Sequence, residues 1–436
     1  MDRIIEFVPL LTLIQEHISK NYAAALTDED KQKQLIPIIN KFLYDTGYSV
    51  RGMSKDDLAK KLYSEMAEYS VITPFLNRDD VEEINVNAWN NIVITYTDGR
   101  MEHLSEHFYS PQNAEDIIKR LLHLSGEIID AAKPHAQGHL PGNTRITAMI
   151  PPVVDKKIGV CASIRRLHPS SVTREKIIAQ GTATEKMVMF LETCLRYGVA
   201  MVVAGVTSSG KTTVLNALLN SIPNDKRIYT IETGARELSL VKTDENGNVV
   251  NNVVHTLARH SDNEAYDVTQ EKLVELSLRF DPDLIVVGEM RDREAADTVE
   301  ASLTGHTVAS TVHATAGPLA HNRIALLCKR KQDVDLNTLL IQTAQAFPIV
   351  VYAHKLEDNS RRLMDISECE VTADGKRIYH CLYRYCITKN ELHNGRYVIE
   401  GHFEQPEIMS EALQRKLMQY GIPQDKLQIF LEKGAD

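Results

Sequence analysis

The chain has 436 residues, of which 43% are hydrophobic and 25% charged, a composition ordinary for a globular protein and a length that suits two or three domains. Lys and Arg number 49 against 59 Asp and Glu, and the formal net charge of −10 argues against a surface that coats nucleic acid. The six cysteines include no CxxC pair, so we expect neither a zinc ribbon nor a disulfide framework, but reduced thiols in the cytoplasm.

Residues 1–70 carry apolar positions at helical spacing with many charges between them, which predicts a helical N-terminal appendage with little strand. This segment either docks onto a partner or caps the core of the next domain. Its apolar stretch at residues 7–14 is too short to span a bilayer and has no small-residue cleavage site. We therefore expect neither a transmembrane helix nor a signal peptide.

Residues 71–170 are predicted to form a mixed α/β domain. Extended segments begin at Val81, and the turn dipeptide Asp98-Gly99 that lies between them is typical of a hairpin. The other expected elements of this domain are a helix at 113–129 and strands at 144–150 and 160–166, with a break at Pro151-Pro152. The polar stretch at 171–184 is the predicted interdomain linker.

In the remaining segment, 185–436, apolar runs alternate with helical patterns, which predicts a largely parallel sheet flanked by helices. Helices are expected near residues 269–279 and 293–303. Residues 238–256, with Asn246-Gly247 near their middle, predict a hairpin excursion from this sheet. Ligands of such sheets bind at the carboxyl ends of the strands, so the polar residues found there are the candidate site.

Residues 205–212 read GVTSSGKT, a complete GxxxxGK[ST] phosphate loop between an apolar run and an expected helix. In such a loop the backbone N–H groups surround the β-phosphate, Lys211 reaches the β and γ oxygens, and the Thr212 hydroxyl ligates Mg²⁺. The N-terminus of the following helix adds partial positive charge. The predicted nucleotide-binding residues are Gly205, Ser208, Ser209, Gly210, Lys211, Thr212 and Thr213. The sequence therefore predicts binding of ATP with Mg²⁺.

Three further polar residues end predicted strands and should lie near the phosphate loop. Glu289 closes an apolar strand and suits a Walker B role, in which it ligates Mg²⁺ or polarises water in the Mg²⁺ shell. Glu232 either orients the attacking water or simply ends a strand at the surface. His313 ends the β-branched run TVASTV and is the predicted γ-phosphate sensor, whereas His306 before that run is equally compatible with a structural role.

Four segments, in chain order, resemble the Walker A, Asp box, Walker B and His box of the secretion and pilus traffic ATPases: GVTSSGKTTVLNALL, TIETGAREL, LIVVGEMRDREA and TGHTVASTVHA. This superfamily comprises the type II and type IV secretion ATPases. Three upstream segments resemble the N-terminal domain of its CpaF/TadA-type branch: VITPFLNRDDVEEINVN, LPGNTRITAMIPP and ASIRRLHP. The resemblance covers roughly residues 70–360.

The resemblance implies a RecA-like ATPase domain with a C-terminal extension at 185–436, and a hexameric ring in which each subunit's two domains clamp ATP. It also implies that Arg145 and Arg165 reach the nucleotide phosphates and couple hydrolysis to domain closure, with Arg166 as the alternative to Arg165. The expected partners are further copies of this chain and the inner-membrane platform proteins of a pilus or secretion machine, without direct nucleic acid. The expected location is the cytoplasm, peripheral at the cytoplasmic face of the membrane.

Two departures from the family pattern bear on this prediction. Thr233 follows Glu232 where the Asp box carries a second carboxylate, for which Glu237 is the candidate substitute. The four-cysteine metal module of the type II relatives is missing, which favours the CpaF/TadA and conjugation-like branches. The sequence predicts an ATP-hydrolysing motor for pilus assembly, protein secretion or conjugative transfer. A nucleotide-gated scaffold without turnover and a RecA-like nucleic-acid translocase are the alternatives.

Overall fold

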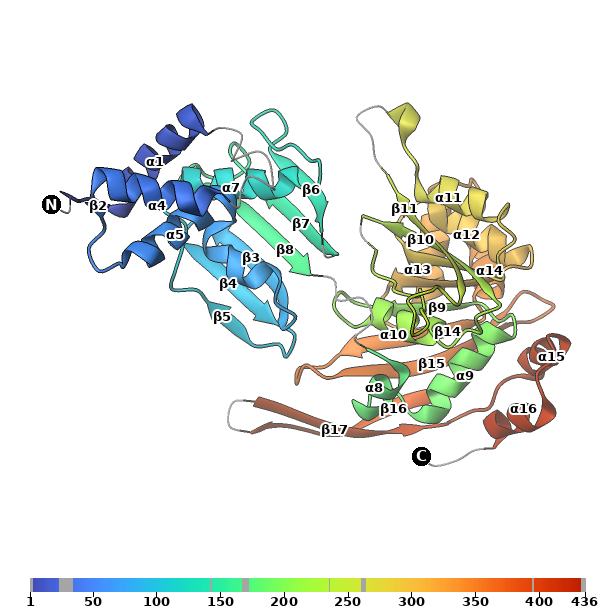
Figure 1. Ribbon diagram of the computed structural model, residues 1–436. Coiled ribbons are helices and arrows are strands. Elements are labelled where there is room, and N and C mark those ends of the chain that lie inside the picture. The colour runs from blue at the N-terminus through green and yellow to red at the C-terminus, as the bar shows by residue number, and fades with distance from the viewer. Residues whose placement is uncertain are drawn as a thin grey trace. The chain divides into compact units, whose positions relative to one another are not determined.

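A computed structural model describes residues 3–22, 34–141, 143–166, 172–234, 236–259, 264–393 and 396–432, with the side chains of residues 264, 393 and 396 left out (Figure 1). The chain divides into two compact units, Met1–His168 and Pro169–Asp436. Within these described ranges, no helix has both the length and the apolar character that crossing a membrane requires.

The first unit begins with helices whose apolar faces pack on one another. Its described helical elements are α1 (Phe7–Asn21), α4 (Leu35–Thr46), α5 (Lys55–Ala67), the short turns η1 (Ser70–Ile72) and α6 (Thr73–Leu76), and α7 (Pro111–His123). Leu10 and Ile14 of α1, Leu43 of α4 and Leu62 of α5 are buried in a common core. The strands in this segment, β1 (Arg3–Ile4) and β2 (Tyr48–Ser49), have two residues each. The prediction of amphipathic helices with little strand agrees with the described part of residues 1–70.

The helical segment is attached to the rest of the first unit through α7. Arg120 of α7 donates hydrogen bonds to the carbonyls of Met66 (2.8 Å), Glu65 (3.2 Å) and Glu68 at the end of α5. These carbonyls have no partner within the helix, so an arginine is well suited to bind them. The helices therefore pack against the neighbouring domain, and their role in docking a partner stays a prediction.

The first unit also holds an antiparallel sheet with the strand order β5-β4-β3-β8-β7-β6. Its strands are β3 (Val81–Ala88), β4 (Asn91–Tyr96), β5 (Met101–His103), β6 (His135–Leu140), β7 (Thr144–Met149) and β8 (Cys161–Arg166). The predicted turn at Asp98-Gly99 lies between β4 and β5, where Gly99 has a φ of 84°. The helix predicted at 113–129 ends earlier, at His123, because Gly126 with a φ of 78° follows in a turn.

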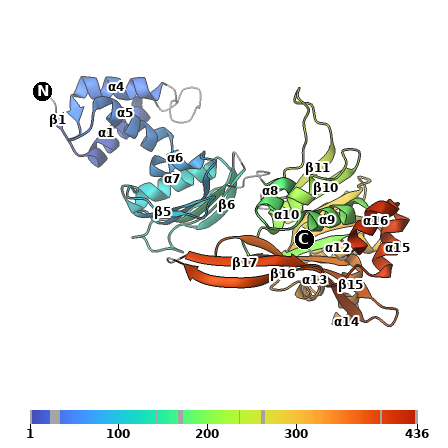
Figure 2. The same cartoon turned by 90° about the horizontal axis from the view of Figure 1, so that it is seen from below.

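The second unit is built on one sheet, with the strand order β11-β10-β12-β13-β9-β14-β15-β16-β17 (Figures 1 and 2). The strands from β11 to β14 in this order pair in parallel, and β15, β16 and β17 continue the sheet antiparallel. Their bounds are β9 (Met201–Gly205), β10 (Arg227–Thr233), β11 (Asn252–Ala258), β12 (Leu284–Met290), β13 (Thr307–His313), β14 (Ile349–Lys355), β15 (Arg361–Val371), β16 (Arg377–His393) and β17 (Arg396–Glu404).

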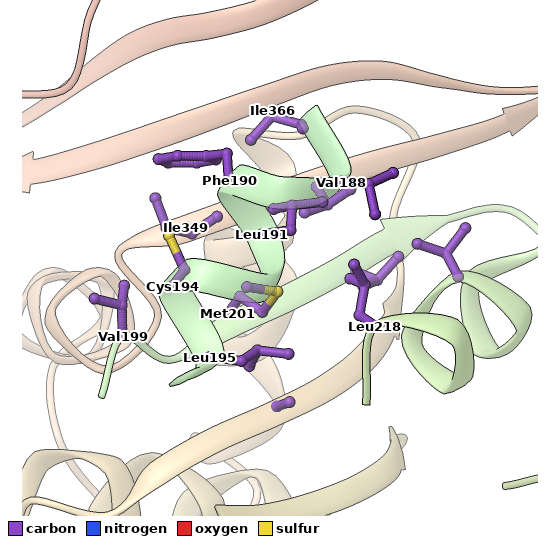
Figure 3. Packing of buried hydrophobic residues seen from close by; sticks show 14 of the residues in the cluster. Val188, Phe190, Leu191, Cys194, Leu195, Val199, Met201, Leu218, Ile349 and Ile366 are labelled. Carbon is purple, nitrogen blue, oxygen red and sulfur yellow. The ribbon is translucent and has the colours of Figure 1, made fainter. Parts of the chain in front are cut away.

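Helices cover both faces of this sheet. The described helices are α8 (Arg174–Ala179), α9 (Glu185–Arg196), α10 (Lys211–Leu219), η2 (Glu264–Tyr266), α11 (Gln270–Ser277), α12 (Glu294–Leu303), α13 (Leu319–Cys328), α14 (Leu336–Ala346), α15 (Glu411–Gln419) and α16 (Gln424–Leu431). One core gathers α8, α9, α10, α15 and α16, and the other gathers α11 to α14. In the first core, Phe190 and Leu191 of α9 lie on Met201 and Ile349 of the sheet (Figure 3). The predicted fold class is confirmed.

Two segments of the second unit differ from the sequence predictions. The segment predicted as linker at 171–184 contains α8, whose Ile177 is buried in the core beside α9. The predicted hairpin at 238–256 is limited to one antiparallel bridge, Thr243 to Val249, around the turn at Gly247. The chain after that turn instead forms β11, which pairs in parallel with β10 at the edge of the sheet.

Candidate functional site

The phosphate loop joins β9 to α10 and needs its two glycines. A Cβ atom on Gly205 would lie 2.3 Å from the carbonyl oxygen of Ala353 in β14, so a larger residue would push two strands apart. Gly210 has a φ of 89° and immediately precedes α10, and Ser208 has a φ of 62°. The Ser209 hydroxyl donates to the carbonyl of Val206 (2.8 Å) and closes the loop.

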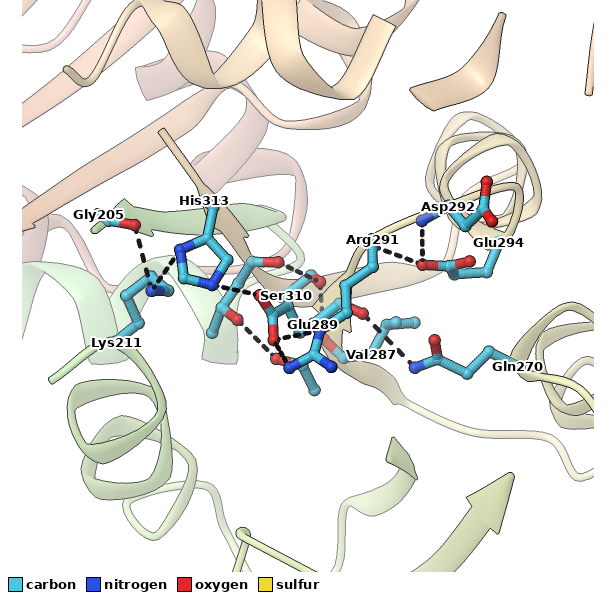
Figure 4. A network of polar contacts seen from close by, with 12 residues as sticks. Gly205, Lys211, Gln270, Val287, Glu289, Arg291, Asp292, Glu294, Ser310 and His313 are labelled. Carbon is cyan, nitrogen blue, oxygen red and sulfur yellow. Dashed lines mark hydrogen bonds and ion pairs between the residues drawn. The ribbon is translucent and has the colours of Figure 1, made fainter. Parts of the chain in front are cut away.

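Lys211 begins α10 and reaches back into the loop. Lys211 is only 8% exposed, and its Nζ donates hydrogen bonds to the carbonyls of Gly205 (3.1 Å) and Val206 (2.9 Å). Nζ also lies 3.4 Å from Nδ1 of His313 at the end of β13 (Figure 4). Burial lowers the pKa of Lys211, while the nearby Glu289 carboxylate acts in the opposite direction. Two backbone carbonyls of the loop thus hold Lys211 at the carboxyl ends of the strands.

His313 and Glu289 continue this network across two neighbouring strands. Nε2 of His313 lies 2.8 Å from Oε1 of Glu289, and Nε of Arg291 donates to Oε2 of Glu289 at 2.7 Å (Figure 4). The pKa of His313 is lowered by burial and then by the Lys211 cation, against the opposing effect of Glu289. The contact of His313 with Glu289 is a close approach of two charged or chargeable groups and not an aligned hydrogen bond, because the buried Oε1 of Glu289 has no hydrogen-bond partner among the described residues.

A bulge in β12 positions Glu289. The pairing of β12 with β13 shifts register between Val287 and Met290. The carbonyls that the bulge frees accept hydrogen bonds from β13 side chains, Ser310 to Val287 (2.7 Å) and Thr311 to Gly288 (2.7 Å). The alternation of apolar residues in the sequence did not predict these two hydrogen bonds. The feature that could have predicted them is the pair of hydroxyl residues, Ser310 and Thr311, inside an otherwise apolar buried strand.

Glu232 lies buried at the end of β10, next to β12. Its Oε1 accepts from the backbone N–H groups of Glu237 (2.7 Å) and Leu238 (2.9 Å), whereas buried Oε2 has no hydrogen-bond partner among the described residues. A Cβ on Gly288 would lie 3.3 Å from Cγ of Glu232, so the two strand ends are in contact. Burial raises the pKa of Glu232 to about 7, despite the two backbone hydrogen bonds that lower it. The carboxyl can therefore exchange a proton near neutral pH.

This raised pKa gives a prediction for stability. Because the folded protein binds the Glu232 proton more tightly than the unfolded chain does, stability falls as the pH rises from about 4.5 to about 7. We expect Glu232→Gln, which keeps a side-chain oxygen for the backbone donors, to raise the free energy of unfolding at pH 8 by about 2–3 kcal/mol. Urea unfolding at pH 8 and pH 5 measures this, and the gain should shrink at pH 5. An equal gain at both pH values would contradict the assignment.

The remaining predicted site residues lie in different places. Thr212 is half-buried and Thr213 exposed at the start of α10. His306 precedes β13, and its buried Nδ1 has no hydrogen-bond partner within the described part of the chain. Glu237 is half-buried beside Glu232, and its charge acts on Lys211.

Arg145 and Arg165 belong to the first unit, where they are cross-strand neighbours on β7 and β8. Nη2 of Arg165 lies 3.7 Å from Oε1 of Glu82, while Arg166 makes the closer ion pair, 2.9 Å to Asp79. The two arginines that the resemblance singled out thus lie opposite each other on adjacent strands of the sheet. Their contact with nucleotide stays a prediction.

The chain is similar to proteins of secretion and conjugation systems. A family described as type II/IV secretion system protein matches residues 65–419. A Mycobacterium tuberculosis protein named for conjugal transfer is 29% identical over 319 residues, 70% of this chain and 86% of the relative. The type IV secretion system protein PtlH of Bordetella pertussis is 27% identical over 327 residues, 67% of this chain and 91% of the relative. The structure of the ATPase DotB from Legionella pneumophila has a TM-score of 0.45 at 17% identity and covers 80% of this chain and 82% of DotB.

Proposed function

Because the chain belongs to the type II/IV secretion system protein family, we propose that it is an ATPase that powers a secretion, conjugation or pilus machine. Membership confirms the family expected from the four ordered motifs, and the match extends beyond residues 70–360 into the C-terminal strands and α15. Glu289 and His313 lie at the carboxyl ends of β12 and β13, and Lys211 follows the loop after β9, the next strand of the sheet. The observation that carries the proposal is that His313 contacts both Lys211 and Glu289 at this place.

The residues present fit a nucleotide with Mg²⁺. The loop N–H groups and Lys211 would hold the phosphates, and the Thr212 hydroxyl and Glu289 carboxylate supply the oxygen ligands that Mg²⁺ prefers. The buried Oε2 of Glu232, which has no hydrogen-bond partner in the described part of the chain, is a further acceptor for a water molecule near this edge. Bound Mg²⁺ would neutralise charge that develops between the β- and γ-phosphates.

The side chains of the protein would each have a distinct role in hydrolysis. Glu232 and Glu289 orient the attacking water, and the near-neutral pKa of Glu232 suits a group that accepts a proton. His313 bridges Lys211 and Glu289, so a change at the γ-phosphate that moves Lys211 also moves Glu289. Arg145 and Arg165 would add positive charge from the first unit and couple hydrolysis to domain closure. Glu237 is the candidate for the second Asp-box carboxylate.

By the same proposal, the working form is a hexameric ring at the cytoplasmic face of a membrane, bound to inner-membrane platform proteins. Residues 1–70 and the region after Ser360 would carry partner specificity. The N-terminal helices that pack against the first unit's domain, and the strands β15 to β17, supply surfaces for that role.

The test is Mg-ATP hydrolysis measured against protein concentration. We expect specific activity to rise cooperatively, because a site shared between subunits is complete only in the assembled ring. Tight ATP binding without turnover at any concentration would overturn the motor and favour the nucleotide-gated scaffold. Hydrolysis that requires added DNA would favour the nucleic-acid translocase instead.

A further inference from the structure

Arg361, the first residue of β15, lies against the phosphate loop. Its Nε donates a hydrogen bond of 3.2 Å to the carbonyl of Ser208. A Cβ atom on Gly210 would lie 3.1 Å from Cδ of Arg361, so the aliphatic part of the arginine packs on the last glycine of the loop. The side chain therefore crosses the loop from Ser208 to Gly210, although 153 positions separate Arg361 from Ser208 in sequence.

The hairpin of β14 and β15 holds Arg361 in this position. Arg361 pairs with Lys355 at the last rung of the hairpin. In the turn that follows β14, the N–H of Leu356 donates to the carbonyl of Ser360 (2.8 Å). The N–H of Ser360 in turn donates to the carboxylate of Asp358 (2.9 Å).

The same hairpin also contacts the start of the phosphate loop, where the Ala353 carbonyl leaves no room for a Cβ on Gly205. It thus touches the loop at Gly205 and at Gly210. Because a packed hairpin has little freedom to shift, this contact fixes the outer part of the loop and the arginine together.

The guanidinium keeps donors beyond the one that binds Ser208. An arginine has five N–H donors, and Nε uses one. Across the ranges that the structure describes, neither Nη atom of Arg361 has a hydrogen bond or ion pair. The adjacent Arg362 differs, because its Nη1 donates to the carbonyl of Gln180 (3.1 Å) and its guanidinium lies 5.6 Å from the ring centroid of Tyr385. Arg361 thus brings a positive charge that no described carboxylate neutralises to a loop built for anions.

We propose that Arg361 is a positioning residue of the phosphate loop, which holds the Ser208 carbonyl and adds positive charge for the phosphates of a nucleoside di- or triphosphate. This inference rests on the nucleotide binding proposed above. Binding by the loop depends on its backbone N–H groups facing inward, and a carbonyl fixed by Arg361 restrains the peptide unit that follows Ser208.

The test compares Arg361→Gln and Arg361→Lys with the matched control Arg362→Gln, in nucleotide titrations of the full chain with Mg-ATP and Mg-ADP at two salt concentrations. Losing a charged hydrogen-bond donor should raise the Kd of Arg361→Gln for both nucleotides about tenfold or more. Arg361→Lys should recover part of this loss at low salt only, since it keeps the charge but not the planar Nε donor. Arg362→Gln should stay within about twofold of the unmodified chain.

Thermal unfolding of each variant shows whether it is folded under the conditions of the titration. The inference is overturned if Arg361→Gln binds within about twofold of the unmodified chain, or if Arg362→Gln loses as much affinity as Arg361→Gln. If the unmodified chain itself binds neither nucleotide, the proposed function fails and this inference fails with it. If the unmodified chain binds nucleotide but Arg361→Gln binds it equally well, only the inference about Arg361 fails and the proposed function stands.

Discussion

Replacing Glu289 with glutamine is expected to leave ATP bound and to lower kcat by about a hundredfold or more, the range seen when a group that handles protons or water in a transition state is removed. The substitution keeps the size of the side chain, and the bulge that places it is maintained by Ser310 and Thr311. What disappears is the negative charge that lies beside Nε2 of His313 and pairs with Arg291. Single-turnover hydrolysis and equilibrium ATP binding, measured on one preparation, separate the two effects.

The matched control for this experiment is Glu271→Gln. Glu271 belongs to α11 and pairs with Lys331 (3.1 Å) and Arg293 (4.0 Å), and within the described residues it has no hydrogen bond or ion pair with Lys211, His313 or Glu289. We expect this variant to hydrolyse ATP at nearly the rate of the unmodified chain. Turnover that survives in Glu289→Gln, or nucleotide binding that is lost with it, would contradict the role given to Glu289.

Most of the candidate site could be predicted because its residues follow local patterns. The phosphate loop needs a fixed spacing of glycines and lysine, and Glu289 and His313 end apolar runs of strand length. Parallel strands bring their carboxyl ends to one edge, so the phosphate loop, Glu289 and His313 were expected to lie near one another, and the structure brings His313 into contact with both Lys211 and Glu289 there.

The parts that were not predicted depend on contacts between distant segments. Arg361 begins a region in which the sequence shows no recognisable motif, and only the pairing of β14 with β9 and β15 brings it to the loop. The bulge at Gly288 is invisible in an apolar run, since periodicity does not report a register shift. β11 was expected in an antiparallel hairpin around Gly247, yet its apolar residues pair in parallel with β10. The turn at Gly247 forms, but the parallel pairing of β11 with β10 extends over more residues than the single bridge beside that turn and decides where β11 lies.

Lys211→Ala is expected to abolish binding of both ATP and ADP, with a loss of affinity of about a hundredfold or more. The ammonium is the cation inside the loop, and burial makes its attraction for phosphate stronger than it would be in water. In the unmodified protein, the carbonyls of Gly205 and Val206 and Nδ1 of His313 surround Nζ. Because burial already lowers the pKa of this lysine, its removal should cost the fold much less than it costs binding.

Ligand-induced stabilisation is the measurement that checks this. A nucleotide at a hundred times its Kd should add about 2.7 kcal/mol to the free energy of unfolding of the unmodified chain, and the same concentration should add about 0.4 kcal/mol or less to Lys211→Ala. Lys226→Ala is the control, because Lys226 pairs with Asp283 at the surface (2.8 Å) and should retain the full effect. If Lys211→Ala were still stabilised by ATP to the same extent, the nucleotide would have to bind elsewhere. The contacts of His313 with Lys211 and with Glu289 would then be structural, since no phosphate would reach the lysine.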